Sequence, residues 1–243
     1  MIACSCDGWL TDVTGMPCFK LAGEGDAAEV GAALADAGDG FFFTKIPVSA
    51  VANVKHFGAA GFYLVDTNVT LDMPARECPA RTETGIVVFP VRTGDHRAAQ
   101  EIAESAFAYS RFHLDPFFPA SIANRVKREW IRSYCEGRRG DVLLVAEQRG
   151  VIIGFLAALI AEIAGRKYAV IDLVAVAPGA RGGGAGRALV NGFQSHYHQR
   201  VDVLRVGTQI ANIPSLGLYR RCGFGATEAT YVLHAQRRNG VCI

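Results

Sequence analysis

Residues 171–188 read IDLVAVAPGARGGGAGRA, and they predict a strand, a turn and a helix around a ligand site. The first part belongs to an apolar, β-branched run over residues 170–176, which is typical of a buried strand. Pro178 and Gly179 end this strand, a glycine-rich turn follows, and a helical pattern runs over residues 187–198. Such an order forms an anion cradle, because glycines allow close approach and the helix start presents free N–H groups.

Two common phosphate-binding motifs do not fit this turn. A Walker loop needs GxxxxGK[ST], and the chain contains neither Gly-Lys-Ser nor Gly-Lys-Thr. The dinucleotide fingerprint GxGxxG fails because the sixth position counted from Gly182 is Arg187. The pattern that fits is [QR]xxGx[GA], formed by Arg181, Gly184 and Gly186. An ordinary glycine-rich connection is the alternative, and the flanking strand and helix argue against it.

The fitting pattern resembles the acyl-CoA pyrophosphate loop of the GNAT superfamily of N-acyltransferases. From residue 85 onward the expected order is strand, helix, helix, three strands, helix, strand, helix and strand, which is the order of that superfamily. The resemblance covers roughly the last two-thirds of the chain. It implies an α/β (α+β) class, with a GNAT acyltransferase fold around a mixed central sheet, preceded by a small α/β N-terminal lobe. The expected domains are residues 1–80, the lobe with its linker, and residues 81–243, the acetyltransferase domain.

Two segments extend the resemblance to one branch of the superfamily, the TDP-fucosamine acetyltransferases. They are SRFHLDPFF at residues 110–118 and VGTQIANIPSLGLYRRCGF at residues 206–224. The resemblance implies acetyl-CoA as cosubstrate and the primary amine of a nucleotide-linked amino sugar as acceptor. Leu218 departs from the pattern, which has a basic residue there; Arg220 or Arg221 could replace that cofactor contact.

The N-terminal lobe is expected to begin with an irregular entry over residues 1–20 that contains a short strand near residues 18–21. A helix over 27–37, a strand over 41–46, a helix over 47–59 and a strand over 62–73 follow. A polar, proline-containing linker is expected over residues 74–84.

The end of the lobe repeats a pattern found near the end of the chain. Phe57 with Gly61-Phe62 parallels Tyr219 with Gly223-Phe224, and in both places a helix closed by Gly-Phe leads into a strand. The lobe is therefore predicted to copy the latter half of an acyltransferase fold, with chance similarity as the alternative. It has no RxxGxG loop and Phe57 has no hydroxyl, so a structural or acceptor-binding role is expected rather than a second active site.

The resemblance assigns the cofactor site residue by residue. Backbone N–H groups of the strand, freed where it diverges from its neighbour, would stabilise the thioester oxyanion. Two arginines would flank the CoA phosphates, glycines and alanines would supply backbone contacts, and Asn212 would bond the pantetheine amides or cap its helix. The predicted cofactor-binding residues are Val174, Ala175, Val176, Arg181, Gly182, Gly183, Gly184, Ala185, Gly186, Arg187, Ala188 and Asn212.

Tyr219 is the predicted general acid for the departing thiolate, because the family places a tyrosine in the corresponding helix. A free tyrosine has a pKa near 10 and a thiol one near 8.5, so proton transfer requires a dry site. The alternative is a tyrosine whose ring packs beneath the Gly-Phe turn. Cys222 could suggest a covalent acyl-enzyme, but it has no histidine nearby in sequence, so direct transfer is expected.

The acceptor side is expected to involve the segment that contains Arg111, His113 and Asp115. Arg111 would pair with a nucleotide diphosphate, and His113 or Asp115 would position or deprotonate the amine. Asp172 lies two residues before Val174 and is expected on the same strand face, where its carboxylate could draw a proton from the ammonium through water. For His113 and Asp115 a capping or surface role is the alternative, and for Asp172 the alternative is a hydrogen-bonded residue at the strand end.

The bulk composition narrows the remaining classes of function. The chain of 243 residues carries a net charge of +2, which implies neither a nucleic-acid nor a membrane partner. Seven scattered cysteines without a CxxC pair are typical of reduced thiols, and no metal site is expected. No signal or membrane segment is recognisable, so a cytoplasmic protein is expected, and a homodimer is allowed. The rival functions are a protein or peptide N-terminal acetyltransferase and a non-catalytic CoA-binding module.

Overall fold

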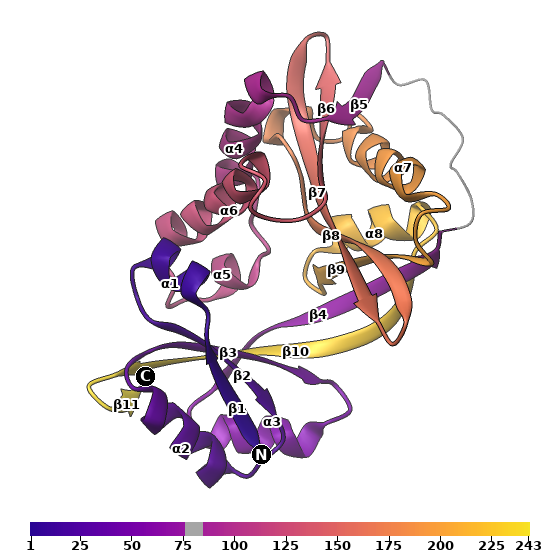
Figure 1. The fold of residues 1–243 in the computed structure, drawn as a ribbon. Coiled ribbons are helices and arrows are strands. Elements are labelled where there is room, and N and C mark those ends of the chain that lie inside the picture. Colours follow the sequence, from indigo (N-terminus) through magenta and orange to yellow (C-terminus); the bar gives the residue numbers. More distant parts are fainter. Residues whose placement is uncertain (76–84) are drawn as a thin grey trace.

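The computed structural model describes residues 1–75 and 85–243, and their strands form one mixed sheet (Figure 1). Most of the expected linker over residues 74–84, and the expected domain boundary at residue 80, lie outside the described residues. In the first part of the chain the elements are β1 (Ile2–Cys6), α1 (Gly8–Thr14), β2 (Cys18–Gly23), α2 (Ala27–Ala37), β3 (Gly40–Pro47), α3 (Val51–Ala59) and β4 (Tyr63–Pro74).

The second part follows the expected GNAT order. Its elements are β5 (Ile86–Pro90), α4 (His96–Ser105), α5 (Arg111–Leu114), α6 (Ala120–Cys135), β6 (Val142–Gln148), β7 (Val151–Ile163), β8 (Arg166–Val176), α7 (Ala185–Tyr197), β9 (Val203–Gln209), α8 (Ile213–Arg221), β10 (Gly225–Arg238) and β11 (Val241–Cys242). The short α5 lies in the segment between α4 and α6, where Pro116 ends the helical pattern.

The expected irregular entry over residues 1–20 is wrong. Residues 2–6 form β1, which pairs antiparallel with β2, and a short helix, α1, lies between these strands. The Asp7 side chain caps that helix by accepting a hydrogen bond from the Leu10 amide at 2.9 Å. Sequence patterning could not show β1, because most of its side chains are exposed and it has no apolar alternation. Pairing with β2 holds it in place.

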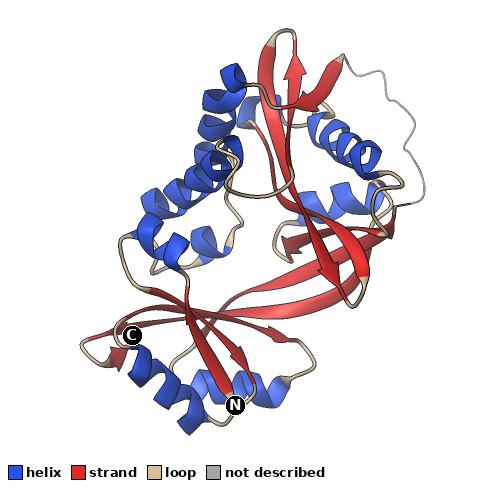
Figure 2. Ribbon diagram, viewed as in Figure 1, coloured by secondary structure: helices blue, strands red, loops and turns tan. Residues whose placement is uncertain are grey.

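The N-terminal strands are part of the same sheet as the C-terminal ones. The order is β1-β2-β3-β10-β4-β9-β8-β7-β6-β5, so β10 lies between β3 and β4, and β4 lies between β10 and β9. β2 and β3 pair in parallel, as do β8 and β9, and the other neighbours along this path are antiparallel. Figure 2 shows the long strands β4 and β10 running together across the middle of the molecule.

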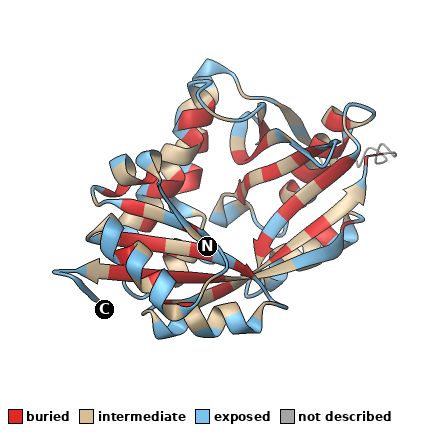
Figure 3. Ribbon diagram, turned by 60° about the horizontal axis from the view of Figure 1, so that its bottom comes forward, coloured by how far each residue is buried: buried red, intermediate tan, exposed pale blue. Residues whose placement is uncertain are grey.

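Four apolar clusters cover the two faces of this sheet. One contains α7, Tyr219 of α8 and the inner side chains of β8 and β9; a second contains α4, Ile131 and Tyr134 of α6, and the opposite side chains of β7 and β8. A third lies under α2 and α3, and a fourth joins α1 to α6 through Phe41 and Phe112. Figure 3 shows the buried residues concentrated along the strands and on the inner sides of the helices. The clusters fix α6 and α7 on opposite sides of β8.

The turn that follows α3 has the same backbone geometry as the turn that follows α8. The Phe62 amide donates to the Phe57 carbonyl at 3.0 Å, and the Phe224 amide donates to the Tyr219 carbonyl at 3.0 Å. The glycines before the two phenylalanines have φ values of 98° and 93°, a left-handed backbone that favours glycine. The sequence echo between the two Gly-Phe helix ends therefore has a structural counterpart.

Candidate active site

The strands β8 and β9 diverge directly before the glycine-rich turn. They pair only from Tyr168 to Ile171 on β8, opposite Val203 to Val206 on β9. Beyond Ile171, β8 continues to Val176 with β7 as its only paired neighbour. The predicted divergence of this strand is thus confirmed, and it leaves the β9-facing side of residues 172–176 open for backbone contacts with a ligand.

A β-bulge lies at the point of divergence. Ala157 on β7 pairs with Leu173 on β8, and Ala158 pairs with Ile171. Asp172 is therefore an extra residue of β8 that has no paired residue on β7. The extra residue shifts the alternation of side chains by one position. As a result, Val174 packs on the α7 side, whereas the Asp172 carboxylate bonds to residues of α6. The expectation that Asp172 and Val174 share a face is therefore wrong.

Three donors hold the Asp172 carboxylate on the α6 side. Trp130 Nε1, Tyr134 Oη and Arg139 Nε each lie 2.8 Å from its Oδ2 atom. Burial alone would raise the pKa of Asp172, but the hydrogen bond and charge of Arg139, together with the other two donors, outweigh it and lower the pKa. A carboxylate stabilised in this way is a poor proton acceptor. The arrangement instead ties α6 to β8 where β8 leaves β9.

The N-terminus of α7 has no side-chain cap. Gly184 occupies the cap position with a φ of 90°, and the first backbone bond runs from the Ala188 amide to the Gly184 carbonyl at 2.9 Å. Within residues 1–75 and 85–243, no acceptor takes the three preceding amides of this helix, at residues 185–187. These free N–H groups and the helix dipole attract an anion.

The corresponding helix of the N-terminal half, α2, is closed in the same place. Asp26 caps α2 by accepting from the amides of Ala28 and Glu29, and the Glu29 carboxylate bonds back to the Asp26 amide at 3.0 Å. Two carboxylates therefore occupy the position that α7 leaves open. Of these two helix starts, only that of α7 can take a phosphate.

The two arginines of the predicted cradle are both exposed. Arg181 donates through Nη2 to the Ala106 carbonyl at 2.6 Å, which links the turn after β8 to the segment after α4. Arg187 lies in the first turn of α7, near Cys222. Burial raises the pKa of the Cys222 thiol, and the positive charge of Arg187 partly offsets this rise. Gly186 brings α7 close to α8, because a Cβ there would lie 3.2 Å from Leu218 Cδ2.

Tyr219 lies under the Gly-Phe turn, as the alternative interpretation of this residue had it. Its side chain packs against Phe224 with ring centroids 6.0 Å apart, and the residue is 3% exposed. In the described part of the chain no group hydrogen-bonds to its hydroxyl. Burial, and to a lesser degree the nearby Cys222, raise its pKa. Asn212 caps α8 by accepting from the Ser215 amide at 3.3 Å.

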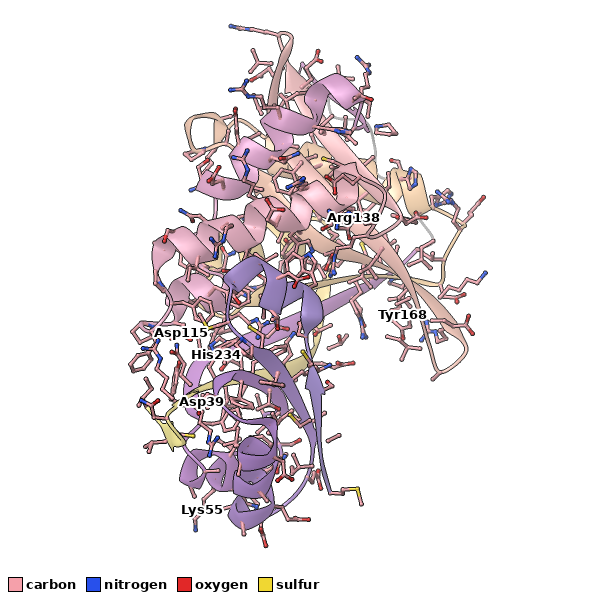
Figure 4. All side chains as sticks on the ribbon, turned by 60° about the vertical axis from the view of Figure 1, so that its left-hand side comes forward. Asp39, Lys55, Asp115, Arg138, Tyr168 and His234 are labelled. Carbon is pink, nitrogen blue, oxygen red and sulfur yellow. The ribbon has the colours of Figure 1, made fainter. Side chains whose placement is uncertain are left out.

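Asp115 is fully buried and faces another protein side chain instead of a ligand. Its Oδ2 atom accepts from His234 Nδ1 at 2.6 Å and from Tyr63 Oη at 3.0 Å (Figure 4). The side chains of Asp115 and His234 are both 0% exposed. The sequence predicts that Asp115 faces an acceptor amine. In the structure its carboxylate is bonded to His234 and Tyr63 instead. It joins α5 to β10 and β4.

His113 is likewise engaged at both ring nitrogens. Its Nδ1 lies 2.6 Å from Ser110 Oγ and its Nε2 lies 2.9 Å from Asn124 Oδ1. Because an amide oxygen only accepts, Nε2 carries the hydrogen and Nδ1 accepts from Ser110. Neither nitrogen is free to take a proton from an amine. The expected acceptor role of His113 is not supported by this geometry.

Arg111 is the member of the predicted acceptor segment whose charged group packs against β3. Its guanidinium lies over the Phe43 ring, 3.9 Å from the centroid, and Nη1 lies 3.5 Å from His234 Nε2. Burial lowers its pKa to about 10, although Asp7, Cys18 and Asp115 partly oppose this. His234 could not be recognised from the sequence as a partner of this segment, because Asp115, to which it bonds, lies 119 positions away.

Two buried ionisable side chains were not identified from the sequence. Asp66 on β4 is 7% exposed, its Oδ2 has no hydrogen-bond partner among the described residues, and burial raises its pKa to about 6. Lys127 on α6 is 6% exposed, and burial lowers its pKa to about 7. A signal was available for Lys127, which lies at helical spacing from Ile131 and Tyr134. None was available for Asp66, because alternation places it on the polar face and only the irregular pairing of β4 with β10 buries it.

The described residues contain neither a metal-ligand cluster nor a helix that could cross a membrane. Over residues 1–75 and 85–243, no three His, Cys, Asp or Glu side chains are grouped so that they could hold a metal ion. Within the same ranges, no helix has both the length and the apolarity that crossing a membrane requires.

Comparison with known proteins gives the family of the chain. The model of the acetyltransferase (GNAT) family matches residues 102–224, so the chain belongs to the GNAT acetyltransferase family. It is 31% identical over 200 residues to the spore coat polysaccharide biosynthesis protein SpsD of Bacillus subtilis. The match covers 80% of this chain and 66% of that protein, so the chain spans slightly less than two-thirds of the relative.

Solved structures share the fold at low sequence identity. A GCN5-related N-acetyltransferase from Sphaerobacter thermophilus aligns with a TM-score of 0.57 at 20% identity, covering 89% of this chain and 66% of that one. A tandem GNAT protein from the clavulanic acid biosynthesis pathway aligns with a TM-score of 0.58 at 13% identity, covering 91% of this chain and 85% of that one. The second alignment includes most of the N-terminal half, where the backbone of the helix end resembles that of α8.

Proposed function

We propose that the protein is an acetyl-CoA-dependent N-acetyltransferase that acts on the primary amine of a nucleotide-linked amino sugar. The observation that carries this proposal is the divergence of β8 from β9 directly before the uncapped N-terminus of α7. One side of this opening offers free amides for a pyrophosphate, and the other offers the exposed backbone of β8 for a thioester.

The cosubstrate would be held by the residues that the family pattern assigns. The amides of residues 185–187 would bind the CoA pyrophosphate, and Arg181 and Arg187 would add positive charge at its edges. The backbone of Val174 to Val176 would contact the pantetheine arm and the acetyl carbonyl. Asn212 already caps α8 through Oδ1, so its Nδ2 would be the group that reaches the pantetheine amides.

Acetyl transfer would proceed in a single complex. The neutral amine nitrogen attacks the thioester carbonyl carbon and forms the C–N bond, and the oxyanion is stabilised by backbone N–H groups of β8. The tetrahedral intermediate then breaks its C–S bond, and the CoA thiolate takes the proton of the Tyr219 hydroxyl. Tyr219 is reprotonated by the proton that the amine nitrogen loses as it becomes an amide nitrogen. The products are the acetamido sugar and free CoA.

The acceptor class is supported by cations on the side of β3 that carries Phe43. Arg111 lies over Phe43, and Lys45 lies two residues further along β3 on the same face. Lys45 is exposed, yet the surrounding protein atoms partly desolvate its ammonium group and lower its pKa. The charges of Arg111 and Lys20 lower that pKa further. Cations that repel each other in this way bind a diphosphate well. The name of the Bacillus subtilis relative, a polysaccharide biosynthesis protein, also supports a sugar acceptor.

The test is a product assay with defined acceptors. The protein would be incubated with acetyl-CoA and either TDP- and UDP-linked amino sugars or peptides with free N-termini, and products would be identified by mass spectrometry. We expect a mass increase of one acetyl group on at least one nucleotide sugar. Acetylation of peptides alone would replace the sugar acceptor by the rival peptide activity. CoA binding without any acetylated product would favour the non-catalytic module.

A further inference from the structure

Lys127 is a buried lysine for which the described residues provide neither a hydrogen bond nor an ion pair. It projects from α6 between two aromatic side chains, with Nζ 5.0 Å from the ring centroids of both Phe107 and Trp130. The residue is 6% exposed, and over the described ranges no group hydrogen-bonds to Nζ. A buried amine without a bonded anion is costly to keep in a protein interior. A structural role in an ion pair does not explain it.

Trp130 and Phe107 also link Lys127 to elements of the proposed acetyl-CoA site. Trp130 donates to Asp172 at the bulge of β8, two residues before Val174. Phe107 directly follows Ala106, whose carbonyl accepts the hydrogen bond from Arg181 of the glycine-rich turn. Lys127 therefore lies on the α6 side of the same divergence of β8 that receives the thioester, between the strand end and the cofactor turn.

The charges around Lys127 favour its neutral form. Two cations act on Lys127, Arg111 on α5 and Arg139 in the segment after α6. The neighbouring His113 stays neutral, because burial lowers its pKa and hydrogen bonds engage both ring nitrogens. Asp172 on β8 is the one anion among the charged groups that affect Lys127, and it is already bonded to Arg139. Burial is the larger effect and Arg111 adds to it, so the pKa of the ammonium falls to about 7. A lysine in this state carries a free electron pair at neutral pH.

We propose that Lys127 is the general base that removes a proton from the ammonium group of the acceptor. This inference rests on the proposed acetyltransferase function. It supplies a base where the carboxylates expected in this role cannot act, because Asp115 and Asp172 are fully engaged by other side chains. The base that the site requires is an amine with a free electron pair.

The proton balance of the reaction is complete with this assignment. The acceptor R–NH₃⁺ transfers one proton to Lys127 Nζ and becomes R–NH₂, whose electron pair attacks the thioester carbonyl carbon. After the C–N bond forms, the nitrogen loses a second proton, which replaces the one that Tyr219 gives to the thiolate. The third hydrogen stays on the amide nitrogen. Lys127 ammonium returns its proton to water before the next turnover.

The first experiment measures the protonation of Lys127 without any acceptor. The chain contains five lysines, so selective ¹³Cε-lysine labelling gives five NMR signals, and the signal missing in Lys127→Met identifies this residue. We expect that signal to titrate near pH 7, about three units below those of the exposed lysines. Titration together with the others would overturn the proposal, whatever the protein acetylates.

The second experiment compares pH profiles of kcat/KM with whichever amine the protein acetylates. General-base catalysis contributes typically about 10²-fold or more, so Lys127→Met should lose about 10²-fold at pH 7 and recover as the acceptor amine deprotonates at higher pH. Lys127→Arg should be equally impaired, because arginine remains charged. Lys55→Met, at an exposed position on α3, is the matched control and should keep the wild-type profile.

The arginine variant separates a base from a positively charged binding residue. Wild-type kcat in Lys127→Arg, or a defect confined to the acceptor KM, would overturn the base assignment. If peptides but no sugars are acetylated, the sugar acceptor is wrong, and the peptide pH profile still tests Lys127. If no amine is acetylated, both the proposed function and the base assignment fail. If the wild-type protein acetylates an amine and only the Lys127→Arg result differs from the expected one, the base assignment fails and the acetyltransferase function stands.

Discussion

Asn68 on β4 lies directly opposite Thr230 on β10, and the pairings on either side of this pair repeat with a constant separation of 162 residues. Asn68 on β4 also pairs with Gln209 on β9, and Thr230 on β10 also pairs with Pro47 on β3. Thr230 lies 162 positions after Asn68, and Gln209 lies 162 positions after Pro47. Each half of the chain thus inserts its last long strand between two strands of the other half, β4 between β10 and β9 and β10 between β3 and β4. The structure is a pseudo-twofold arrangement with exchanged strands.

The two halves differ at the positions where chemistry is expected. The start of α7 is open, whereas the start of α2 is closed by Asp26 and Glu29. Phe57 occupies the place of Tyr219 and keeps the packing of the turn without the hydroxyl. We therefore expect one acetyl-CoA site for each chain, in the C-terminal half.

Tyr219→Phe should lower kcat by about 10²-fold, the typical contribution of a general acid. The fold should survive, because Phe57 shows that a phenylalanine supports the same turn. Calorimetry with CoA should give wild-type affinity, since the hydroxyl serves the leaving thiolate only. Tyr231→Phe, on the α2 and α3 side of the sheet, is the control and should leave kcat unchanged. Unchanged turnover in Tyr219→Phe would exclude the general-acid role.

Gly183→Asp should weaken CoA binding by at least about tenfold, while Gly183→Ala should not. The backbone of Gly183 is not left-handed, and a Cβ there would lie 3.6 Å from the Ala180 carbonyl, so both side chains fit. The aspartate places a carboxylate at the open start of α7, as Asp26 does at the start of α2, and it repels a phosphate. Calorimetric titration with CoA measures the effect. Equal affinities of the two variants would show that the phosphate binds elsewhere.

The buried His234 should make the protein less stable at acid pH. Burial lowers its pKa to about 4 in the folded state, despite the Asp115 partner, against about 6.5 when unfolded. Between these values the unfolded chain binds more protons, so the free energy of unfolding rises with pH from 4 to 6.5, by roughly 3 kcal/mol. His234→Gln should flatten this dependence in urea unfolding measured across the range. His96→Gln is the control, and a wild-type slope in His234→Gln would contradict the assignment.

Asp66→Asn should stabilise the fold at pH 7 but not at pH 4. Burial raises the pKa of Asp66 to about 6 in the folded state, above the unfolded value of 3.8. Between these values the folded protein binds more protons, so this group makes stability fall as pH rises, and its full cost is present above pH 6. Asparagine has nearly the same shape without the charge, so a gain of about 1–2 kcal/mol is expected at pH 7. Thermal unfolding at both pH values is the measurement; equal effects would show that the carboxylate is solvated.

The local parts of the site could be predicted from the sequence because they depend on neighbouring residues. The strand, the glycine-rich turn and the helix of residues 171–188 follow from apolar patterning, two left-handed glycines and a helix start within one short segment. The Gly-Phe turns after α3 and α8 are local in the same sense, since each bond closes within five residues. These features indicated the family, the cosubstrate and the repeated half.

The acceptor side could not be predicted because its partners are far apart in the sequence. The bulge at Asp172 depends on how β7 registers against β8, and it turned the carboxylate toward α6. Asp115 was directed inward by His234, 119 residues away, through a strand exchange that no pattern in either segment shows.

What the sequence by itself determined is the acetyl-CoA loop of the GNAT family, since local backbone geometry and a helix N-terminus are encoded by consecutive residues. Only the tertiary structure decided which ionisable side chains near the diverging strand are already bonded to other residues. The carboxylates expected there are engaged by other side chains, and Lys127 lies between Phe107 and Trp130 beside the diverging strand. The physical reason is that burial, and with it the proton affinity of each group, is set by elements that meet only when the sheet is complete.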